Sequence, residues 1–166
     1  MVDEKKILDK NSANFQTVWI VGGGWSLRGF VWERLQGRRV VVVNRAHEVL
    51  PWAEVLYFSD LRFWNWYEPQ LRQFKGRKCS MGNFSVEQWA ALGVERWRPT
   101  GPYGIDFEPR CLRHGNSSGY AAMNVAAQME GVKTLVLLGF DMQASPDWVP
   151  PRGTDGVHWH SGYSIG

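Results

Sequence analysis

Gly115-Asn116-Ser117-Ser118-Gly119 opens an alanine-rich segment that runs to Gly131. The side chain of Asn116 or Ser117 can cap a helix by accepting hydrogen bonds from the backbone N–H groups of its first turn. Apolar residues then recur at the helical spacing i, i+3, i+4, i+7, and they are Ala122, Val125, Ala126 and Met129. Because most of these side chains are small, the sequence predicts a helix that packs closely against a sheet and ends at Gly131.

A continuous apolar run, Thr134-Leu135-Val136-Leu137-Leu138, follows the predicted helix and leads into Gly139-Phe140-Asp141. Runs of this kind form strands that are buried on both faces of a parallel sheet. A helix, a short turn and a buried strand make up half of a doubly wound α/β domain, in which ligands bind beyond the carboxyl ends of the strands. Ser117, Ser118 and Gly119 also offer free N–H groups at the positive end of the helix dipole, which suits a phosphate.

The first part of the chain has a similar arrangement. Thr17 to Val21 is an apolar run that leads into Gly22-Gly23-Gly24-Trp25-Ser26-Leu27, and a helical pattern then reaches Gly37. A strand, a glycine turn and a helix favour phosphate binding, because glycines let the backbone approach the ligand and the helix N-terminus faces it. The dinucleotide fingerprint is incomplete, since Leu27 stands where its third glycine would be, and no Walker A lysine follows.

Polar residues follow the next two predicted strands. Val40 to Val43 is followed by Asn44, and Val55 to Phe58 is followed by Ser59 and Asp60. The amide of Asn44 offers both a donor and an acceptor for a ribose or a base edge, and a turn residue at the end of the strand is an equally good interpretation. Because the carboxyl ends of parallel strands meet at one edge, Asn44 and Ser59 are expected to face the same cleft as the glycine turn.

The remaining segments complete a single domain. They are predicted as a helix over 61–74 that Pro69 kinks or shortens, a short strand at 78–81, a helix over 85–92 capped by Ser85, an edge strand at 94–97 and a functional loop over 98–114. Residues 1–15 are polar and form an N-terminal arm. The expected fold is one doubly wound, Rossmann-like α/β domain over 16–166 with a mostly parallel sheet, either truncated at its C-terminus or a minimal version.

The composition narrows the classes of function. The net charge is +3 without a long basic run, so nucleic acid is not expected as a partner. No segment is long enough to span a membrane. Cys79 and Cys111 have neither metal-ligand spacing nor a disulfide-rich setting, so a cytoplasmic protein is expected. Ten tryptophans are unusual, and some are expected to be partly exposed. They indicate a substrate-stacking surface or a homo-oligomer interface, and a simple bias of composition is the alternative. The candidates with polar neighbours are Trp64, Trp66, Trp89 and Trp97.

Two histidines lie in the segment His158-Trp159-His160 near the end of the chain. Imidazoles titrate near neutral pH, so both are candidates for acid–base chemistry. In an extended segment alternate residues point to the same side, so the two rings could also bind one metal ion, with Asp141 or Asp155 as a third ligand. The sequence leaves a general base, a metal-dependent hydrolase and a pair without a role open as alternatives.

The order of the motifs resembles that of two related groups of proteins. The motifs are the glycine turn over 22–27, Asn44, Ser59-Asp60, Ser117-Ser118-Gly119, Gly139-Phe140-Asp141-Met142 and His158-Trp159-His160. One group is the bacterial sialyltransferase family of the lipooligosaccharide type. The other is the MptE-like family, whose archaeal members are hydroxymethyldihydropterin pyrophosphokinases. The resemblance covers most of residues 17–162 and extends to short bacteriophage and prophage relatives without an assigned activity.

The resemblance to the sialyltransferases implies roles for individual residues. Their Gly-Asn-Gly-Pro-Ser-Leu nucleotide loop corresponds to Gly22 through Leu27, with Gly23 and Trp25 in place of the Asn and the Pro. Their base histidine corresponds to His158. Their other nucleotide-binding positions correspond to Asn44, Ser118, Gly119 and Gly139. Their tyrosines after Gly-x-Asp, which steady the leaving phosphate, have no counterpart, because Gln143 stands there.

The expected function is a transferase with a nucleotide-activated donor, most closely a glycosyltransferase with a CMP-sugar type donor. His158 and Asp141 are the catalytic candidates, with His158 taking the proton of the acceptor hydroxyl. The nucleotide-binding candidates are Gly22, Gly23, Gly24, Ser26, Asn44, Ser59, Asp60, Ser117, Ser118, Gly119 and Gly139. The alternatives are a pyrophosphokinase using ATP and Mg²⁺ held by Asp60 and Asp141, a His158/His160 metal-dependent hydrolase, and a non-catalytic nucleotide-binding module.

Overall fold

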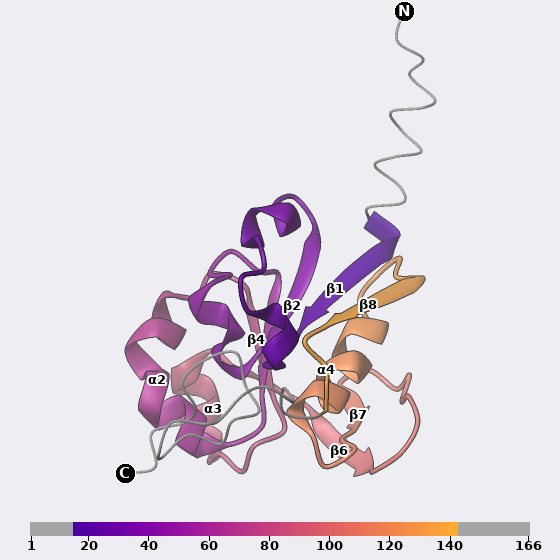
Figure 1. The fold of residues 1–166 in the computed structure, drawn as a ribbon. Helices are drawn as coiled ribbons and strands as arrows, with labels where there is room; N and C mark the ends of the chain where they lie inside the picture. Colours follow the sequence, from indigo (N-terminus) through magenta and orange to yellow (C-terminus); the bar gives the residue numbers. More distant parts are fainter. Residues whose placement is uncertain (1–14, 143–166) are drawn as a thin grey trace, which may run out of the picture.

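A six-stranded parallel sheet forms the centre of the computed structural model, which describes residues 15–142 (Figure 1). The strand order is β5-β4-β3-β2-β1-β8, and every neighbouring pair is parallel. The strands are β1 (Thr17–Val21), β2 (Arg39–Val43), β3 (Val55–Phe58), β4 (Arg77–Ser80), β5 (Glu95–Arg96) and β8 (Thr134–Leu138). The predicted Rossmann-like α/β fold with a parallel sheet is confirmed.

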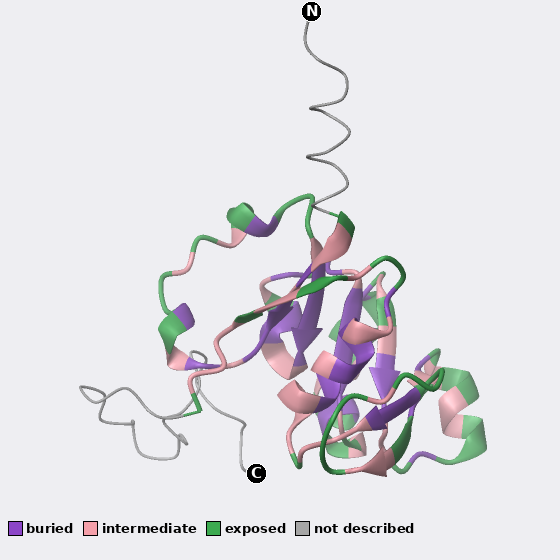
Figure 2. Ribbon diagram, turned by 90° about the vertical axis from the view of Figure 1, so that its right-hand side faces the viewer, coloured by how far each residue is buried: buried purple, intermediate pink, exposed green. Residues whose placement is uncertain are grey.

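Helices and turns cover both faces of the sheet. One face packs against α2 (Leu61–Gln73), α3 (Val86–Leu92) and three 3-10 turns, η1 (Trp25–Leu27), η2 (Trp32–Leu35) and η3 (Asn44–Glu48). The other face packs against α4 (Ser118–Ala127) and a small second sheet of β6 (Arg98–Gly101) and β7 (Cys111–Arg113). The middle strands β2 and β3 are therefore buried almost throughout (Figure 2).

The helix α4 connects the strands on one side of β1 to the strand on its other side. The chain adds strands outward from β1 to β5, and α4 then returns it to the other side of β1, where β8 pairs. The predicted apolar face packs on the sheet, since Ala122, Val125, Ala126 and Met129 are all buried. The point at which the winding reverses, between β1 and β8, is where doubly wound folds usually bind ligands.

Two predicted elements have a different local structure. The helix expected after the glycine turn is replaced by η1 and η2, because Gly29 between them adopts a left-handed φ of 72° that interrupts a helix. The loop expected over 98–114 contains β6 and β7, which pair in parallel with an irregularity between Pro99 and Gly101. Pro and Gly are tolerated there because a two-stranded sheet loses few ladder bonds to them.

Three further expectations need correction. The strand β8 is not buried on both faces: within the described range it is an edge strand, and Leu137 is 43% exposed. An apolar run does not distinguish an edge from a central strand. Pro69 does not shorten α2, which continues to Gln73. Ser117 is the N-cap residue of α4, but its side chain makes no capping hydrogen bond.

Of residues 15–142, none belongs to a helix long and apolar enough to cross a membrane.

Candidate functional site

A pocket of about 260 Å³ opens at the carboxyl edge of the sheet, next to the ends of β2 and β3 and the first residue of α4. Its lining residues are Asn44, Ser59, Asp60, Arg62, Phe63, Trp66 and Ser118. The volume is close to the lower end of the range for small-molecule sites. Four of the predicted site residues are therefore brought together from three separate segments of the chain, namely Asn44, Ser59, Asp60 and Ser118.

Two hydroxyl groups join the β3 side of the pocket to the α4 side. The Oγ atoms of Ser59 and Ser118 lie 2.8 Å apart, which is hydrogen-bond distance. A hydroxyl carries one donor hydrogen, so whichever serine donates to the other leaves the second hydrogen for another acceptor. The pair can therefore present one O–H donor and several lone pairs to a ligand.

Asn44 lines the pocket from a constrained backbone. Its φ is 50°, in the left-handed region that Asn adopts more readily than most residues. Its carbonyl oxygen is 2.8 Å from Nδ1 of His47. Because a carbonyl only accepts, Nδ1 carries the hydrogen. Burial, as the largest cause, lowers the pKa of His47 below its ordinary value, so this ring is held neutral. A neutral ring that anchors Asn44 is a feature that the sequence analysis missed.

The helix α2 supplies an aromatic and charged wall. Phe63 is buried, and Trp66, one turn further along the same helix face, is 50% exposed. Asp60 caps the helix by accepting from the Phe63 N–H at 3.0 Å, and its other carboxylate oxygen lies 3.4 Å from the exposed Arg62 guanidinium. An exposed indole at a pocket is suited to stacking against a base. Trp64, by contrast, is buried in the core.

The glycine turn after β1 is closed by the segment after β8. Backbone N–H groups of Gly22 and Gly24 donate to the carbonyls of Leu138 and Gly139, each at 2.8 Å. The carboxylate of Asp141 accepts from the Ser26 N–H at 2.7 Å and from its hydroxyl at 2.6 Å. The backbone N–H and the hydroxyl of Ser26, a predicted nucleotide-binding residue, are thus both bound to a carboxylate of the protein itself.

The ring of Phe140 lies between the glycine turn and the start of α4. A Cβ atom at Gly22 would lie 3.1 Å from one edge of this ring, and a Cβ atom at Gly119 would lie 2.7 Å from the other edge. The two segments therefore meet at the same edge of the sheet, with an aromatic ring between them. Seven predicted nucleotide-binding residues lie outside the lining of the 260 Å³ pocket, namely Gly22, Gly23, Gly24, Ser26, Ser117, Gly119 and Gly139, and so does the catalytic candidate Asp141.

The histidine predictions lie outside the described residues. His158, His160, Asp155 and Gln143 are in the segment after 142, so the general base and the metal-dependent hydrolase remain predictions. Of the residues between 15 and 142, no group of three or more His, Cys, Asp and Glu could hold a metal ion. The carboxylates of Asp60 and Asp141, which are the predicted Mg²⁺ ligands, both accept hydrogen bonds from protein groups.

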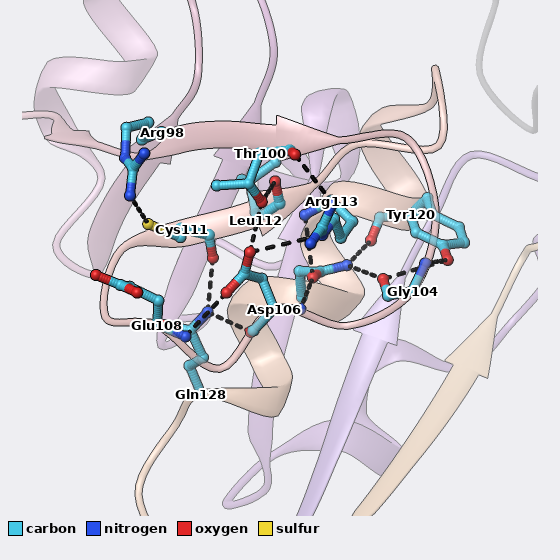
Figure 3. Close-up of polar contacts among 11 residues, drawn as sticks. Arg98, Thr100, Gly104, Asp106, Glu108, Cys111, Leu112, Arg113, Tyr120 and Gln128 are labelled. Carbon is cyan, nitrogen blue, oxygen red and sulfur yellow. Dashed lines mark hydrogen bonds and ion pairs between the residues drawn. The ribbon is translucent and has the colours of Figure 1, made fainter.

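A polar stripe on α4 holds the segment 98–114 in place (Figure 3). The stripe consists of Tyr120, Asn124 and Gln128, which are spaced i, i+4 and i+8 and so share one face of the helix. The Asn124 side-chain oxygen accepts from the N–H groups of Asp106 at 2.8 Å and Arg113 at 3.1 Å. These bonds fix the conformation of a segment that is rich in Pro and Gly. The i, i+4, i+8 spacing of the three polar residues is the sequence signal from which the stripe could have been predicted.

Comparison of the chain with models of protein families, with curated proteins and with solved structures finds no match in any of the three. The class of protein is therefore defined by the fold, which is Rossmann-like with a six-stranded parallel sheet.

Proposed function

We propose that this protein is a transferase whose nucleotide-activated donor binds in the 260 Å³ pocket, as the resemblance to the sialyltransferases and MptE-like proteins suggests. The observation that carries the proposal is the convergence of Asn44, Ser59 and Ser118 at the carboxyl edge of a doubly wound sheet. Polar side chains from three segments of the chain around one opening support the binding of a polar ligand.

Each wall of the pocket suits one part of a nucleotide. The Trp66 indole offers a stacking surface for the base, and the Asn44 amide offers a donor and an acceptor for a base or ribose edge. The Ser59 and Ser118 hydroxyls suit the ribose. Arg62 also lines the pocket, and its exposed guanidinium, 3.4 Å from the Asp60 carboxylate, supplies a positive charge for a phosphate.

The reaction is proposed to be glycosyl transfer from a CMP-sugar type donor. The bond from the sugar to the donor phosphate breaks, a bond to the acceptor oxygen forms, and the nucleotide leaves with its phosphate. His158 takes the proton of the acceptor hydroxyl, a task that typically contributes about 10²–10⁴-fold to the rate.

A screen of nucleotides by thermal unfolding tests the proposal on the full chain. Saturation with CMP at about 100 times its Kd stabilises the folded state by about 2.7 kcal/mol, which corresponds to a rise in Tm of about 5–10 °C. CMP or CDP acting without metal supports glycosyl transfer, ATP acting only with Mg²⁺ supports the pyrophosphokinase, and Zn²⁺ acting alone supports the hydrolase. No shift with any nucleotide contradicts the proposal.

The variant Asn44→Gly assigns the binding to this pocket. Glycine accepts the φ of 50° without strain, so the substitution removes the amide and keeps the backbone. The expected result is a CMP affinity about tenfold lower, which is the loss of about 1.4 kcal/mol. Asn116→Gly is the matched control, because Asn116 has a φ of 52° and does not line the pocket. Equal loss in both variants contradicts the assignment.

A further inference from the structure

A second pocket, of about 330 Å³, lies between β5 and the small β6–β7 sheet. Its lining residues are Arg96, Arg98, Glu108, Pro109, Arg110 and Cys111, none of which lines the first pocket. Three guanidinium groups, which are charged at all physiological pH values, face one carboxylate. We propose that this pocket binds a phosphorylated small molecule through Arg96, Arg98 and Arg110.

The backbone explains why the three arginines converge. Arg96 ends β5 and Arg98 begins β6, so in this extended segment they lie on the same side, while Trp97 between them is buried in the core. The N–H of Arg98 donates to the carbonyl of Arg110 at 2.8 Å, which brings Arg110 opposite Arg98. Arg96 at the end of β5, Arg98 at the start of β6 and Arg110 just before β7 therefore surround the opening.

The arginines of this pocket differ from others on the molecule. Arg39, Arg45, Arg62, Arg72, Arg77 and Arg113 each form an ion pair with a carboxylate. Among the residues that the structure describes, Arg96, Arg98 and Arg110 have no carboxylate at ion-pair distance. The neighbouring carboxylate of Glu95 is bound by Arg77 at 2.8 Å from both of its oxygens. The three positive charges thus remain available to an anion.

Arg110 is held in a strained backbone conformation, with a φ of 58°. A left-handed residue other than Gly, Asn or Asp is uncommon, and such strain is concentrated at functional sites. The conformation is maintained from both sides, because the Arg110 N–H donates to Gln128 at 3.2 Å and its carbonyl accepts from Arg98. The guanidinium of Arg98 is fixed in turn by a contact of 3.1 Å with the Cys111 sulfur (Figure 3).

The chemistry of the lining favours a phosphate group on a small ligand. Guanidinium groups match the oxygens of a phosphate with paired N–H donors, and several of them together neutralise its two charges. The volume is within the range of small-molecule sites, so the ligand has room for a group beyond the phosphate.

Titration of the full chain with glucose 6-phosphate, at constant ionic strength, tests the proposal. Glucose is the uncharged control, and calorimetry gives the Kd. The expected result is binding of glucose 6-phosphate and inorganic phosphate without binding of glucose. Equal binding of glucose, or tighter binding of a single-stranded oligonucleotide than of glucose 6-phosphate, overturns the proposal. No binding of either phosphate compound overturns it as well.

The variant Arg110→Gly separates the charge from folding. Glycine relieves the left-handed strain, so the Tm without ligand is expected to be no lower than that of the parent chain, whereas affinity for glucose 6-phosphate falls at least tenfold. Arg72→Ala, which removes a surface arginine paired with Glu68, is the matched control and should leave the affinity unchanged. Asn44→Gly should leave it unchanged too, so this site and the nucleotide pocket can fail independently. Unchanged affinity in Arg110→Gly overturns the proposal.

Discussion

The side-chain hydroxyls of Ser59 and Ser118 lie 2.8 Å apart, although 59 residues separate the two serines in the chain. Ser59 follows β3 directly, and Ser118 is the first residue of α4. Their contact therefore joins the end of β3 to the start of α4, the helix that leads the chain to β8 beside β1. It also forms part of the wall of the proposed nucleotide pocket.

Substitution of this pair should be non-additive. Ser59→Ala or Ser118→Ala alone is expected to lower the free energy of unfolding by about 0.5–1.5 kcal/mol, because each leaves the other hydroxyl without its partner. The double variant should cost less than the sum of the two. Urea unfolding of the four proteins measures the coupling, and strictly additive losses would show that the contact does not exist in solution.

The centre of the parallel sheet was predictable because β1, β2, β3 and β8 are apolar runs bounded by glycine or polar residues, whereas β4 and β5 are mostly polar. The pocket was predictable in part, since Asn44 and Ser59 follow two such runs and strand ends meet at one edge. The role of Asp141 was not predictable, because it binds Ser26, which is 115 positions away in the chain. Only the pairing of β1 with β8 brings the two residues together. The edge position of β8 was missed for a similar reason, because the composition of a strand does not determine its position in the sheet.

The contact between Asp141 and Ser26 should contribute to stability. Its two charge-assisted hydrogen bonds would be worth about 1.5–3 kcal/mol each if buried, and partial exposure reduces the expected cost of Asp141→Ala to about 1 kcal/mol in total. Asp141→Asn should cost less, because the amide oxygen still accepts one bond. Thermal unfolding measures both variants. A cost for Ser26→Ala that persists undiminished in the Asp141→Ala background would contradict the assigned contact.

The buried amide of Asn124 should be among the most sensitive positions outside the apolar core. Asn124→Ala leaves the N–H groups of Asp106 and Arg113 without their acceptor, so the expected loss in the free energy of unfolding is about 2–4 kcal/mol. Segment 98–114 should also be cleaved faster in limited proteolysis. The exposed Asn83 supplies the control, since Asn83→Ala is expected to stay within about 0.5 kcal/mol of the parent chain. Equal proteolysis rates for the two variants would refute the anchoring role.

The neutral ring of His47 should make stability depend on pH. Burial lowers its pKa in the folded state below the ordinary 6.5, so the unfolded chain binds more protons as the pH falls. This contribution to stability is therefore complete above about pH 6.5 and is lost progressively below it. Urea unfolding at a series of pH values between about 5.5 and 7.5 should show the free energy rising with pH in the parent chain and in His114→Ala. His47→Leu should be less stable overall, because it loses the bond to the Asn44 carbonyl, and should have a flatter profile. If the slope survives in His47→Leu and disappears in His114→Ala, the pH dependence does not come from His47 and the prediction is wrong.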